Sequence, residues 1–545
     1  MISNLALLKE VNLWIESDPD PKTALQLQNW VESGDEESLN NCFQGFLQFG
    51  TAGLRGPVGP GPSCMNRAVV HRASAGIALY MKARGLTKVV IGRDARHGSS
   101  DFADESAQVF CGAGMKVFVL PRPLPTPVLA YAVNYLKADV GIMVTASHNP
   151  PQDNGYKVYL GGNVDAIRYQ GSQIVSPTDR DISSEIAKIK SLQPRAKNWE
   201  TLNDDVFNDY VKVTGSLARS QDDLKVVYSA MHGVGTETLK AVFNRAGFSL
   251  PNFVKEQAEP DPDFPTVKFP NPEEPGAIDL SISLAREVNA DLVIANDPDA
   301  DRCAAAINDP NLGWRMLSGD EIGTILGYYI ATNFPESCQN KAFANSIVSS
   351  SALGKIAKLK GIEFHETLTG FKWLAKIPNL RFGYEEAIGY AVDPIHVNDK
   401  DGISAALMLR QCAAELKAKG SSMAQYLEEI WQQVGFHATK QISIRVPNIA
   451  LVEEVLLKMR NSPPSEIGKR VITKFEDLAR PDGNLPPTNG IKFYLGENIR
   501  VIVRPSGTEA KLKCYIEVVG IIEKKAEINS IISSLQNELT ELLKI

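Results

Sequence analysis

Residues 292–302 read Leu-Val-Ile-Ala-Asn-Asp-Pro-Asp-Ala-Asp-Arg, an apolar run that leads directly into three carboxylates. The same kind of unit recurs at residues 88–94, 140–150 and 225–235, where a short β-branched run is followed by a polar or glycine-rich turn and a helical pattern. Strands that alternate with helices predict α/β units around mixed or parallel sheets. In such sheets the ligand-binding loops follow the carboxyl ends of the strands.

The acidic loop at the end of the first run predicts a site for a divalent cation. Asp297, Asp299 and Asp301 stand at alternate positions, and three crowded carboxylates are costly without a counter-ion. A hard cation with oxygen ligands relieves that cost. An EF-hand loop does not fit, because Arg302 stands where it needs glycine and Asn308 where it needs glutamate. A solvated acidic turn is the alternative, and the buried type of the preceding strand favours the metal.

A second loop, residues 145–150 (Thr-Ala-Ser-His-Asn-Pro), carries a candidate nucleophile. Ser147 stands at the end of an expected strand next to His148, and Lys157 follows further along the chain. The loop is not the Gly-x-Ser-x-Gly elbow of esterases. Taken alone, it is more simply a Ser/Asn turn closed by proline.

Two further loops are suited to anions. Residues 49–56 combine three glycines with Arg55, although they lack the Gly-Lys-Ser/Thr ending of a P-loop. Residues 504–509 (Arg-Pro-Ser-Gly-Thr-Glu) offer a guanidinium, two hydroxyls and flexible backbone N–H groups between two expected strands. Each loop taken alone is more simply an ordinary tight turn.

Two other segments carry charged residues in loops. Glu385 and Glu386 stand between glycines in residues 383–390, and carboxylates accept hydrogen bonds from sugar hydroxyls well. Lys400 opens a helical segment and could donate a proton, pair with phosphate or simply be solvated. A charged turn is the alternative for the glutamates.

Composition and charge exclude several classes of protein. The chain has 545 residues, 43% hydrophobic and 22% charged, which excludes collagen-like, coiled-coil and largely disordered chains. Its net charge is -7 and it has no block of Lys and Arg, so we expect no nucleic-acid partner. Seven scattered cysteines without a C-x-x-C pair predict a reducing, cytoplasmic location. No apolar run of about 18 residues and no secretory signal pattern is present, so we expect no membrane association.

Together these loops resemble the signatures of the α-D-phosphohexomutase superfamily. The serine loop, the metal loop, the sugar loop and the C-terminal phosphate loop occur in that family's order, from about residue 49 to about residue 519. Residues 50–56 and 383–389 resemble most the phosphoglucomutase-2/phosphopentomutase branch. The resemblance implies three related mixed α/β domains and a C-terminal α+β domain around a central cleft. We place them at residues 1–215, 216–325, 326–442 and 443–545, carrying the serine, metal, sugar and phosphate loops in turn.

The resemblance also implies a set of site residues. Ser147 would be the phosphorylated nucleophile, and its phosphate would bind Mg²⁺ together with Asp297, Asp299 and Asp301. The other catalytic positions would be Arg55, His148, Lys157 and Lys400. The substrate contacts would be Arg302, Thr369, Gly370, Glu385, Glu386, Arg504, Ser506, Gly507 and Thr508.

The implied activity is that of a phosphosugar mutase acting on small sugar phosphates. Phosphoserine would give its phosphoryl group to a sugar monophosphate, and the bisphosphate so formed would turn over and return its other phosphate to the serine. We predict interconversion of glucose 1-phosphate and glucose 6-phosphate, activated by a sugar bisphosphate such as glucose 1,6-bisphosphate. The sequence does not predict the oligomeric state.

Other activities remain as alternatives. Ala387 follows the two glutamates where many phosphoglucomutases have serine, so a phosphomannomutase or a phosphopentomutase with the same chemistry is open. A non-catalytic sugar-phosphate sensor is another alternative. Such a protein would need no nucleophile, so the intact Ser147, acidic loop and Lys157 argue against it. A phosphatase acting through the same serine would not need the second phosphate loop at residues 504–508.

Overall fold

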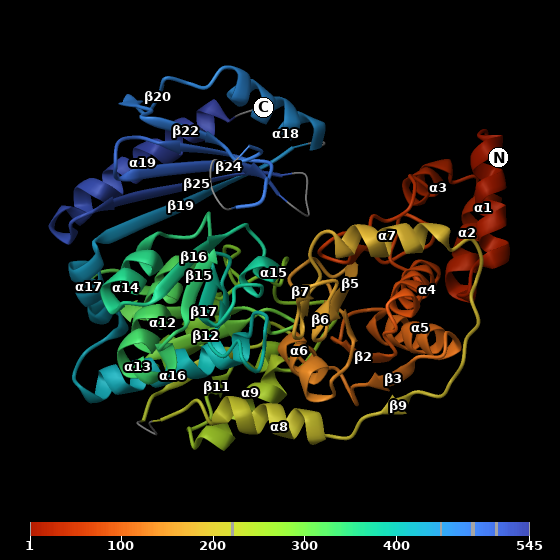
Figure 1. Cartoon of the computed structure of the whole chain (residues 1–545), viewed down its shortest axis with the longest axis horizontal. Helices are drawn as coiled ribbons and strands as arrows, with labels where there is room; N and C mark the ends of the chain where they lie inside the picture. Colours follow the sequence, from red (N-terminus) through yellow and green to blue (C-terminus); the bar gives the residue numbers. More distant parts are fainter. Residues whose placement is uncertain (1, 220–222, 447–448, 481–484, 507–510, 544–545) are drawn as a thin grey trace. The chain divides into compact units, whose positions relative to one another are not determined.

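The computed structural model describes residues 2–219, 223–446, 449–480, 485–506 and 511–543 (Figure 1). It divides into two compact units. Unit 1 comprises residues 1–316 and 389–419, and unit 2 comprises residues 317–388 and 420–545. Each unit is built around two main sheets, and each is described by itself below.

The first sheet of unit 1 carries the serine loop. Its strands β2, β3, β4 and β9 run parallel, whereas β5 is antiparallel to β4 and β1 is antiparallel to β5. Across the sheet the order is β1 (Leu54–Pro57), β5 (Asp153–Leu160), β4 (Val140–Val144), β2 (Lys88–Arg93), β3 (Lys116–Val119) and β9 (Glu200–Thr201), with β8 (Ser172–Gln173) paired to β5. The helices of this region are α4 (Arg67–Ala83), α5 (Ser99–Gly112), α6 (Thr126–Tyr135) and α7 (Thr178–Lys188).

The register of this sheet explains how three distant loops meet. Lys157 on β5 lies opposite Met143 on β4, and Arg55 on β1 lies opposite Gly155 on β5. Ser147 follows the carboxyl end of β4. Arg55, Ser147 and Lys157 therefore all lie near the side of the sheet where β4 ends.

The second sheet of unit 1 carries the metal loop. Strands β10, β11 and β12 run parallel, and β13 and β14 return antiparallel. The order is β11 (Asn252–Phe253), β10 (Val226–Ser229), β12 (Leu292–Asn296), β13 (Cys303–Asp309) and β14 (Gly313–Met316). The accompanying helices are α8 (Asp205–Gly215), α9 (Gly235–Ala246), α10 (Lys255–Ala258) and α11 (Asp279–Glu287). Every residue of β12 is buried, so its apolar run is a core strand as the sequence predicts.

Two other parts complete unit 1. The N-terminal helices α1 (Leu5–Ser17), α2 (Pro21–Ser33) and α3 (Glu36–Cys42) share a small core. Residues 389–419 return from the later chain with β18 (Gly389–Ala391) and α16 (Gly402–Ala418), and α16 packs against α9, β12 and β13. The short strands β6 (Asn163–Val164) and β7 (Ile167–Arg168) form a separate hairpin.

Unit 2 combines a parallel sheet with an antiparallel one. Strands β16 (Glu363–Thr367), β15 (Ala342–Ser346) and β17 (Leu380–Glu385) run parallel, next to α12 (Gly319–Asn333), α13 (Pro335–Cys338), α14 (Ala352–Lys360), α15 (Phe371–Leu374) and α17 (Met423–Val434). The antiparallel sheet has the order β19 (Phe436–Arg445), β25 (Lys511–Gly520), β24 (Ile499–Pro505), β23 (Ile491–Tyr494) and β22 (Lys474–Asp477). The helices α18 (Ile449–Asn461) and α19 (Lys525–Leu542), the 3₁₀ turn Ile522–Lys524 and the hairpin β20 (Glu466–Ile467)–β21 (Arg470–Val471) accompany it.

The predicted fold class is confirmed. Three sheets contain parallel strands flanked by helices, and the C-terminal sheet is antiparallel throughout. The C-terminal helix α19 buries Ile528, Ile532, Leu535 and Leu539, whose spacing places them on one face of the helix. No helix among the described residues has the length and apolar character of a membrane span. The predicted domain boundaries stay predictions.

Candidate active site

The serine loop is held in an unusual backbone conformation. Ser147 has a φ of 52°, in the left-handed region that non-glycine residues rarely adopt. Its N–H donates to Thr145 Oγ1 at 2.8 Å. Arg96 is 4% exposed and its guanidinium donates to four backbone carbonyls of the loop, those of Ser147, Asn149, Pro150 and Asp153, at 2.6, 2.6, 2.9 and 3.2 Å. One buried cation thus offsets the cost of the strained turn that presents Ser147.

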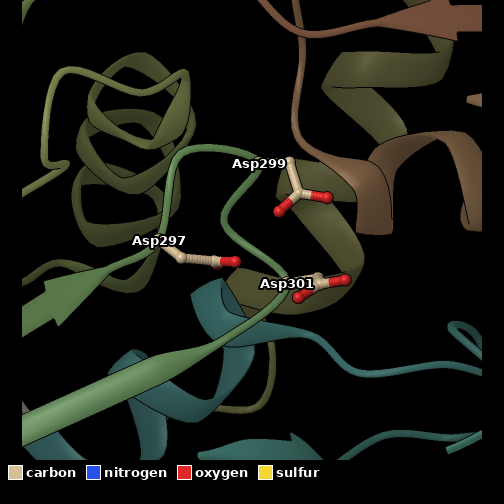
Figure 2. Close-up of side chains that lie close together, drawn as sticks. All are labelled: Asp297, Asp299 and Asp301. Carbon is tan, nitrogen blue, oxygen red and sulfur yellow. The ribbon is translucent and has the colours of Figure 1, made fainter. Parts of the chain in front are cut away.

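The metal loop joins β12 to β13 and folds three carboxylates inward (Figure 2). Asp297, Asp299 and Asp301 are all buried, and one ligand oxygen from each lies within 4.8 Å of the others. The loop closes through a hydrogen bond from the Ala300 N–H to the Asp297 carbonyl at 2.8 Å, and Ala300 has a φ of 53°. The alternation of acidic residues therefore turns all three side chains to one place.

The structure brings the serine loop, Lys157 and Lys400 to these carboxylates. Ser147 Oγ donates to Asp297 Oδ2 at 2.6 Å. Lys157 Nζ donates to Asp299 Oδ2 at 2.7 Å and to Asp301 Oδ2 at 2.9 Å, and Lys400 Nζ lies 3.2 Å from Asp301 Oδ2. Residues far apart in the sequence thus form one buried charged cluster within unit 1.

The remaining carboxylate oxygens fit a divalent cation. Asp299 Oδ1 and Asp301 Oδ1 are buried and accept no hydrogen bond from any described residue. Burial, together with the charges of Asp299 and Asp301, raises the pKa of Asp297 well above its usual range. Buried acceptors without partners and mutually repelling carboxylates are both costly. The oxygen-only donor set is the one that Mg²⁺ prefers, so the residues present fit that ion.

His148, Arg55 and Arg302 surround the serine. His148 Nδ1 lies 3.2 Å from Ser147 Oγ. Burial and the positive charges of Arg302 and Arg55 hold the pKa of His148 well below its usual range, so the imidazole is neutral. Arg55 donates to Asn149 Oδ1 at 3.1 Å, and Arg302 Nε lies 3.9 Å from both Asp297 Oδ2 and Asp301 Oδ1.

Three residues that support the site were not predicted as site residues from the sequence. Besides Arg96, Thr126 holds the metal loop, because its hydroxyl donates to Asp299 Oδ2 at 2.6 Å and its N–H to the Asp299 carbonyl at 2.9 Å. Gly233 lies so close to the loop that an added Cβ would stand 2.2 Å from Pro298 Cα. The only sequence signal was their position in polar turns near strand ends.

The predicted sugar-contact residues lie in unit 2. The Gly370 N–H donates to Glu385 Oε1 at 2.6 Å, which joins the loop of Thr369 and Gly370 to the loop of the two glutamates. Glu386 accepts from two serine hydroxyls, one at the end of β15 and one just after it. Arg504 lies on β24, and Ser506 follows it, with its N–H donating to the Lys511 carbonyl at 2.8 Å. Gly507 and Thr508 lie outside the described residues.

A buried acid in unit 2 predicts a pH-dependent stability. Asp320 Oδ1 accepts from the Ser350 N–H at 2.6 Å and from the Tyr384 hydroxyl at 3.0 Å. Burial raises the pKa of Asp320 to about 7. The hydrogen bond from Ser350 opposes this rise, whereas the negative charges of Glu386 and Glu517 add to it. Between the ordinary pKa of aspartate and about 7, the folded chain holds a proton that the unfolded chain has lost.

Unfolding free energy should therefore fall as pH rises across that window, by at most about 1.4 kcal/mol per pH unit from this group. Asp320→Asn should remove this slope, because the amide cannot ionise but its oxygen can still accept both hydrogen bonds. Urea unfolding of the whole chain, followed at a series of pH values between 5 and 8 for the wild type and the variant, measures the difference. Parallel pH profiles for the two proteins would show that Asp320 does not titrate there.

Comparisons with known proteins show the family of the chain. Models of the phosphoglucomutase/phosphomannomutase α/β/α domains I, II and III match residues 47–191, 205–312 and 318–434, and the model of the C-terminal domain matches residues 443–528. The chain therefore belongs to the phosphoglucomutase/phosphomannomutase family, within the α-D-phosphohexomutase superfamily. It is an enzyme of this family of mutases, whose members act on small sugar phosphates.

Individual relatives carry different names. The Haemophilus influenzae protein named "Probable phosphomannomutase" is 45% identical over 471 residues, covering 85% of this chain and 95% of its own. The Mus musculus phosphopentomutase is 35% identical and covers 98% of this chain and 93% of its own. The solved open form of the Paramecium phosphoglucomutase pp63/parafusin shares the fold, with a TM-score of 0.70 at 21% identity, over 91% of this chain and 95% of that one.

Proposed function

We propose that this chain is a Mg²⁺-dependent phosphosugar mutase that moves a phosphoryl group between the 1- and 6-positions of glucose phosphate. Ser147 is the group that is phosphorylated, and a sugar bisphosphate such as glucose 1,6-bisphosphate primes it. The observation that carries the proposal is the placement of Ser147 Oγ, 2.6 Å from Asp297 Oδ2 and 3.2 Å from His148 Nδ1. The reducing environment that the scattered cysteines indicate supports a cytoplasmic location.

The charged residues of unit 1 divide the work of phosphoryl transfer, which depends mainly on positioning and charge neutralisation. Asp297, Asp299 and Asp301 would hold Mg²⁺, which when bound supplies positive charge to the oxygens of the transferring group. Lys157 and Lys400 neutralise the acidic loop from the other side, through Asp299 and Asp301. Arg55 and Arg302 add positive charge beside the serine, and Arg96 keeps its loop in the presenting conformation.

The transfer itself balances with one mobile proton. The bond from phosphorus to Ser147 Oγ breaks as a bond from phosphorus to the sugar hydroxyl oxygen forms. The proton leaves the sugar hydroxyl and one is returned to Ser147 Oγ, and neutral His148 is placed to carry it. In the second transfer the other phosphate of the bisphosphate returns to Ser147 by the same exchange in reverse.

Unit 2 supplies recognition in this proposal. Glu385 and Glu386 accept hydrogen bonds from sugar hydroxyls, next to the loop of Thr369 and Gly370. Arg504 and Ser506, with Gly507 and Thr508 by resemblance, hold the phosphate that is not reacting. The hydrogen bond from the Gly370 N–H to Glu385 supports this assignment, because it holds the two loops next to each other.

A mass measurement tests the proposal. The purified chain is incubated with Mg²⁺ and glucose 1,6-bisphosphate, and intact mass should show one added phosphoryl group. Glucose 1-phosphate should then accept this phosphoryl group to give glucose 1,6-bisphosphate, and return of the 1-phosphate to Ser147 should yield glucose 6-phosphate and the phosphorylated chain. Mannose 1-phosphate and ribose 1-phosphate are run in parallel, because relatives are named phosphomannomutase and phosphopentomutase. Faster discharge by one of these sugars would reassign the substrate. Release of free phosphate would indicate a phosphatase, and no labelling would indicate a sensor.

A further inference from the structure

Glu386 is held by two serine hydroxyls at the end of the neighbouring strand. Ser346 Oγ and Ser349 Oγ donate to the same oxygen, Glu386 Oε2, at 3.1 and 3.2 Å. The Glu386 N–H donates in turn to Ser349 Oγ at 3.0 Å, and the two hydroxyls lie 2.9 Å apart. Ser349 therefore contacts both the backbone and the carboxylate of Glu386.

These contacts follow from the strand order of unit 2. Ser346 ends β15, and Glu386 follows the end of β17, which is the parallel neighbour of β15. Parallel neighbours bring their carboxyl ends to one sheet edge. Both serines are almost completely buried, at 0% and 1% exposure, whereas Glu386 is half-buried. A buried pair of donors thus faces a carboxylate that remains reachable from solvent.

An arginine of the antiparallel sheet holds the backbone of Ser349 in place. Arg500, on β24, donates from Nη2 to the Ser349 carbonyl at 2.6 Å. Its guanidinium also pairs with Glu517 on β25 at 2.8 Å and with Glu366 on β16 at 3.2 Å. Because Arg500 is anchored by two carboxylates, the turn that carries Ser349 has a rigid support.

We propose that Ser349, anchored by Arg500, is a positioning residue that orients the Glu386 carboxylate for a sugar hydroxyl. Both serine hydroxyls donate to Oε2, which fixes the direction in which the carboxylate presents its second oxygen, Oε1. The inference rests on the proposed function, in which Glu386 recognises the sugar. A glutamate that is already ordered loses less conformational freedom when the ligand binds, which strengthens binding. This gain in binding free energy is the same for the ground state and the transition state.

The expected signature is therefore a change in KM without a matching change in kcat. Ser349→Ala should raise KM for glucose 1-phosphate by roughly 3- to 10-fold and leave kcat within about 2-fold. Ser349→Thr keeps the hydroxyl and should restore KM. Ser351→Ala is the matched control, because it removes a hydroxyl from the same turn, but this hydroxyl lies 3.3 Å from His437 Nδ1.

Equilibrium binding separates this inference from the proposed function. Calorimetric titration with glucose 6-phosphate, without the activating bisphosphate, should show the same weakening for Ser349→Ala and rescue by Ser349→Thr. The unfolding midpoints of all variants are measured alongside. Wild-type affinity in Ser349→Ala, failure of threonine to restore it, or an equal loss in Ser351→Ala would overturn the positioning role. A wild-type chain that neither binds nor converts glucose phosphates would instead overturn the proposed function, and with it the sugar contact of Glu386.

Discussion

Replacement of Ser147 by alanine should lower kcat for any sugar phosphate by roughly 10⁴-fold or more, because the variant lacks the hydroxyl that would carry the phosphoryl group. Ser147 Oγ is the atom that meets both Asp297 and His148. The backbone of the loop should persist in the variant, because Arg96 binds carbonyl oxygens and does not contact the side chain. Coupled assay of glucose 6-phosphate formation measures the loss.

The control for this experiment is a buried serine outside the site. Ser106 is 0% exposed and donates to the Phe102 carbonyl within α5. Ser106→Ala should keep kcat within about 2-fold of the wild type, because a helix hydroxyl that does not contact the reacting groups affects stability more than activity. The alanine variant at Ser147 should also fail to gain a phosphoryl group from glucose 1,6-bisphosphate. Turnover within about 10-fold of the wild type would remove Ser147 from the mechanism.

Local elements of this fold could be predicted from the sequence because they depend on short-range patterns. The apolar runs at 140–144 and 292–295 are β4 and β12, and the change from apolar to polar residues marks their ends. Helix α2 begins at Pro21, and Asp20 caps it by accepting from the Lys22 N–H, an arrangement that depends only on neighbouring residues. Each of these signals lies within a few residues.

Contacts that depend on strand order could not be predicted in this way. Arg96 follows β2, yet its guanidinium binds the loop after β4, and only the sheet order makes these two loops neighbours. The hydrogen bond between Ser349 and Glu386 likewise depends on β15 and β17 being neighbours in the sheet. The return of residues 389–419 to unit 1 is likewise invisible in a linear sequence, although it brings Lys400 to Asp301.

The candidate site residues could be predicted from the sequence for a different reason than the strands and helices. Ser147, the three aspartates and Lys157 are chemically conspicuous in sequence, and four ordered loops resembled one family. The structure adds their distances within unit 1. Their roles, and the substrate that unit 2 prefers, stay predictions for the variants described here.

Replacement of Asp301 by asparagine should weaken Mg²⁺ binding by at least about 10- to 100-fold, the range that loss of a mere supporting contact already costs a metal site. The two carboxylate oxygens of Asp301 have different surroundings. Oδ2 pairs with Lys157 at 2.9 Å and Lys400 at 3.2 Å, whereas Oδ1 is buried without a donor among the described residues. An asparagine oxygen can occupy one position, but the charge is lost and its NH₂ group would face either a lysine or the cation.

The same substitution should lower kcat by roughly 10²- to 10³-fold at saturating Mg²⁺, because the cluster then holds two lysines against two carboxylates and no longer matches the charge of the transferring group. Calorimetric Mg²⁺ titration and the Mg²⁺ dependence of the initial rate measure the two effects separately. Asp309→Asn is the matched control, since Asp309 ends β13 and pairs with Arg315 away from the triad. If Asp301→Asn lowered the unfolding midpoint but left the Mg²⁺ titration unchanged, Asp301 would serve only to hold the lysines. The acidic loop would then bind its cation through Asp297 and Asp299 alone.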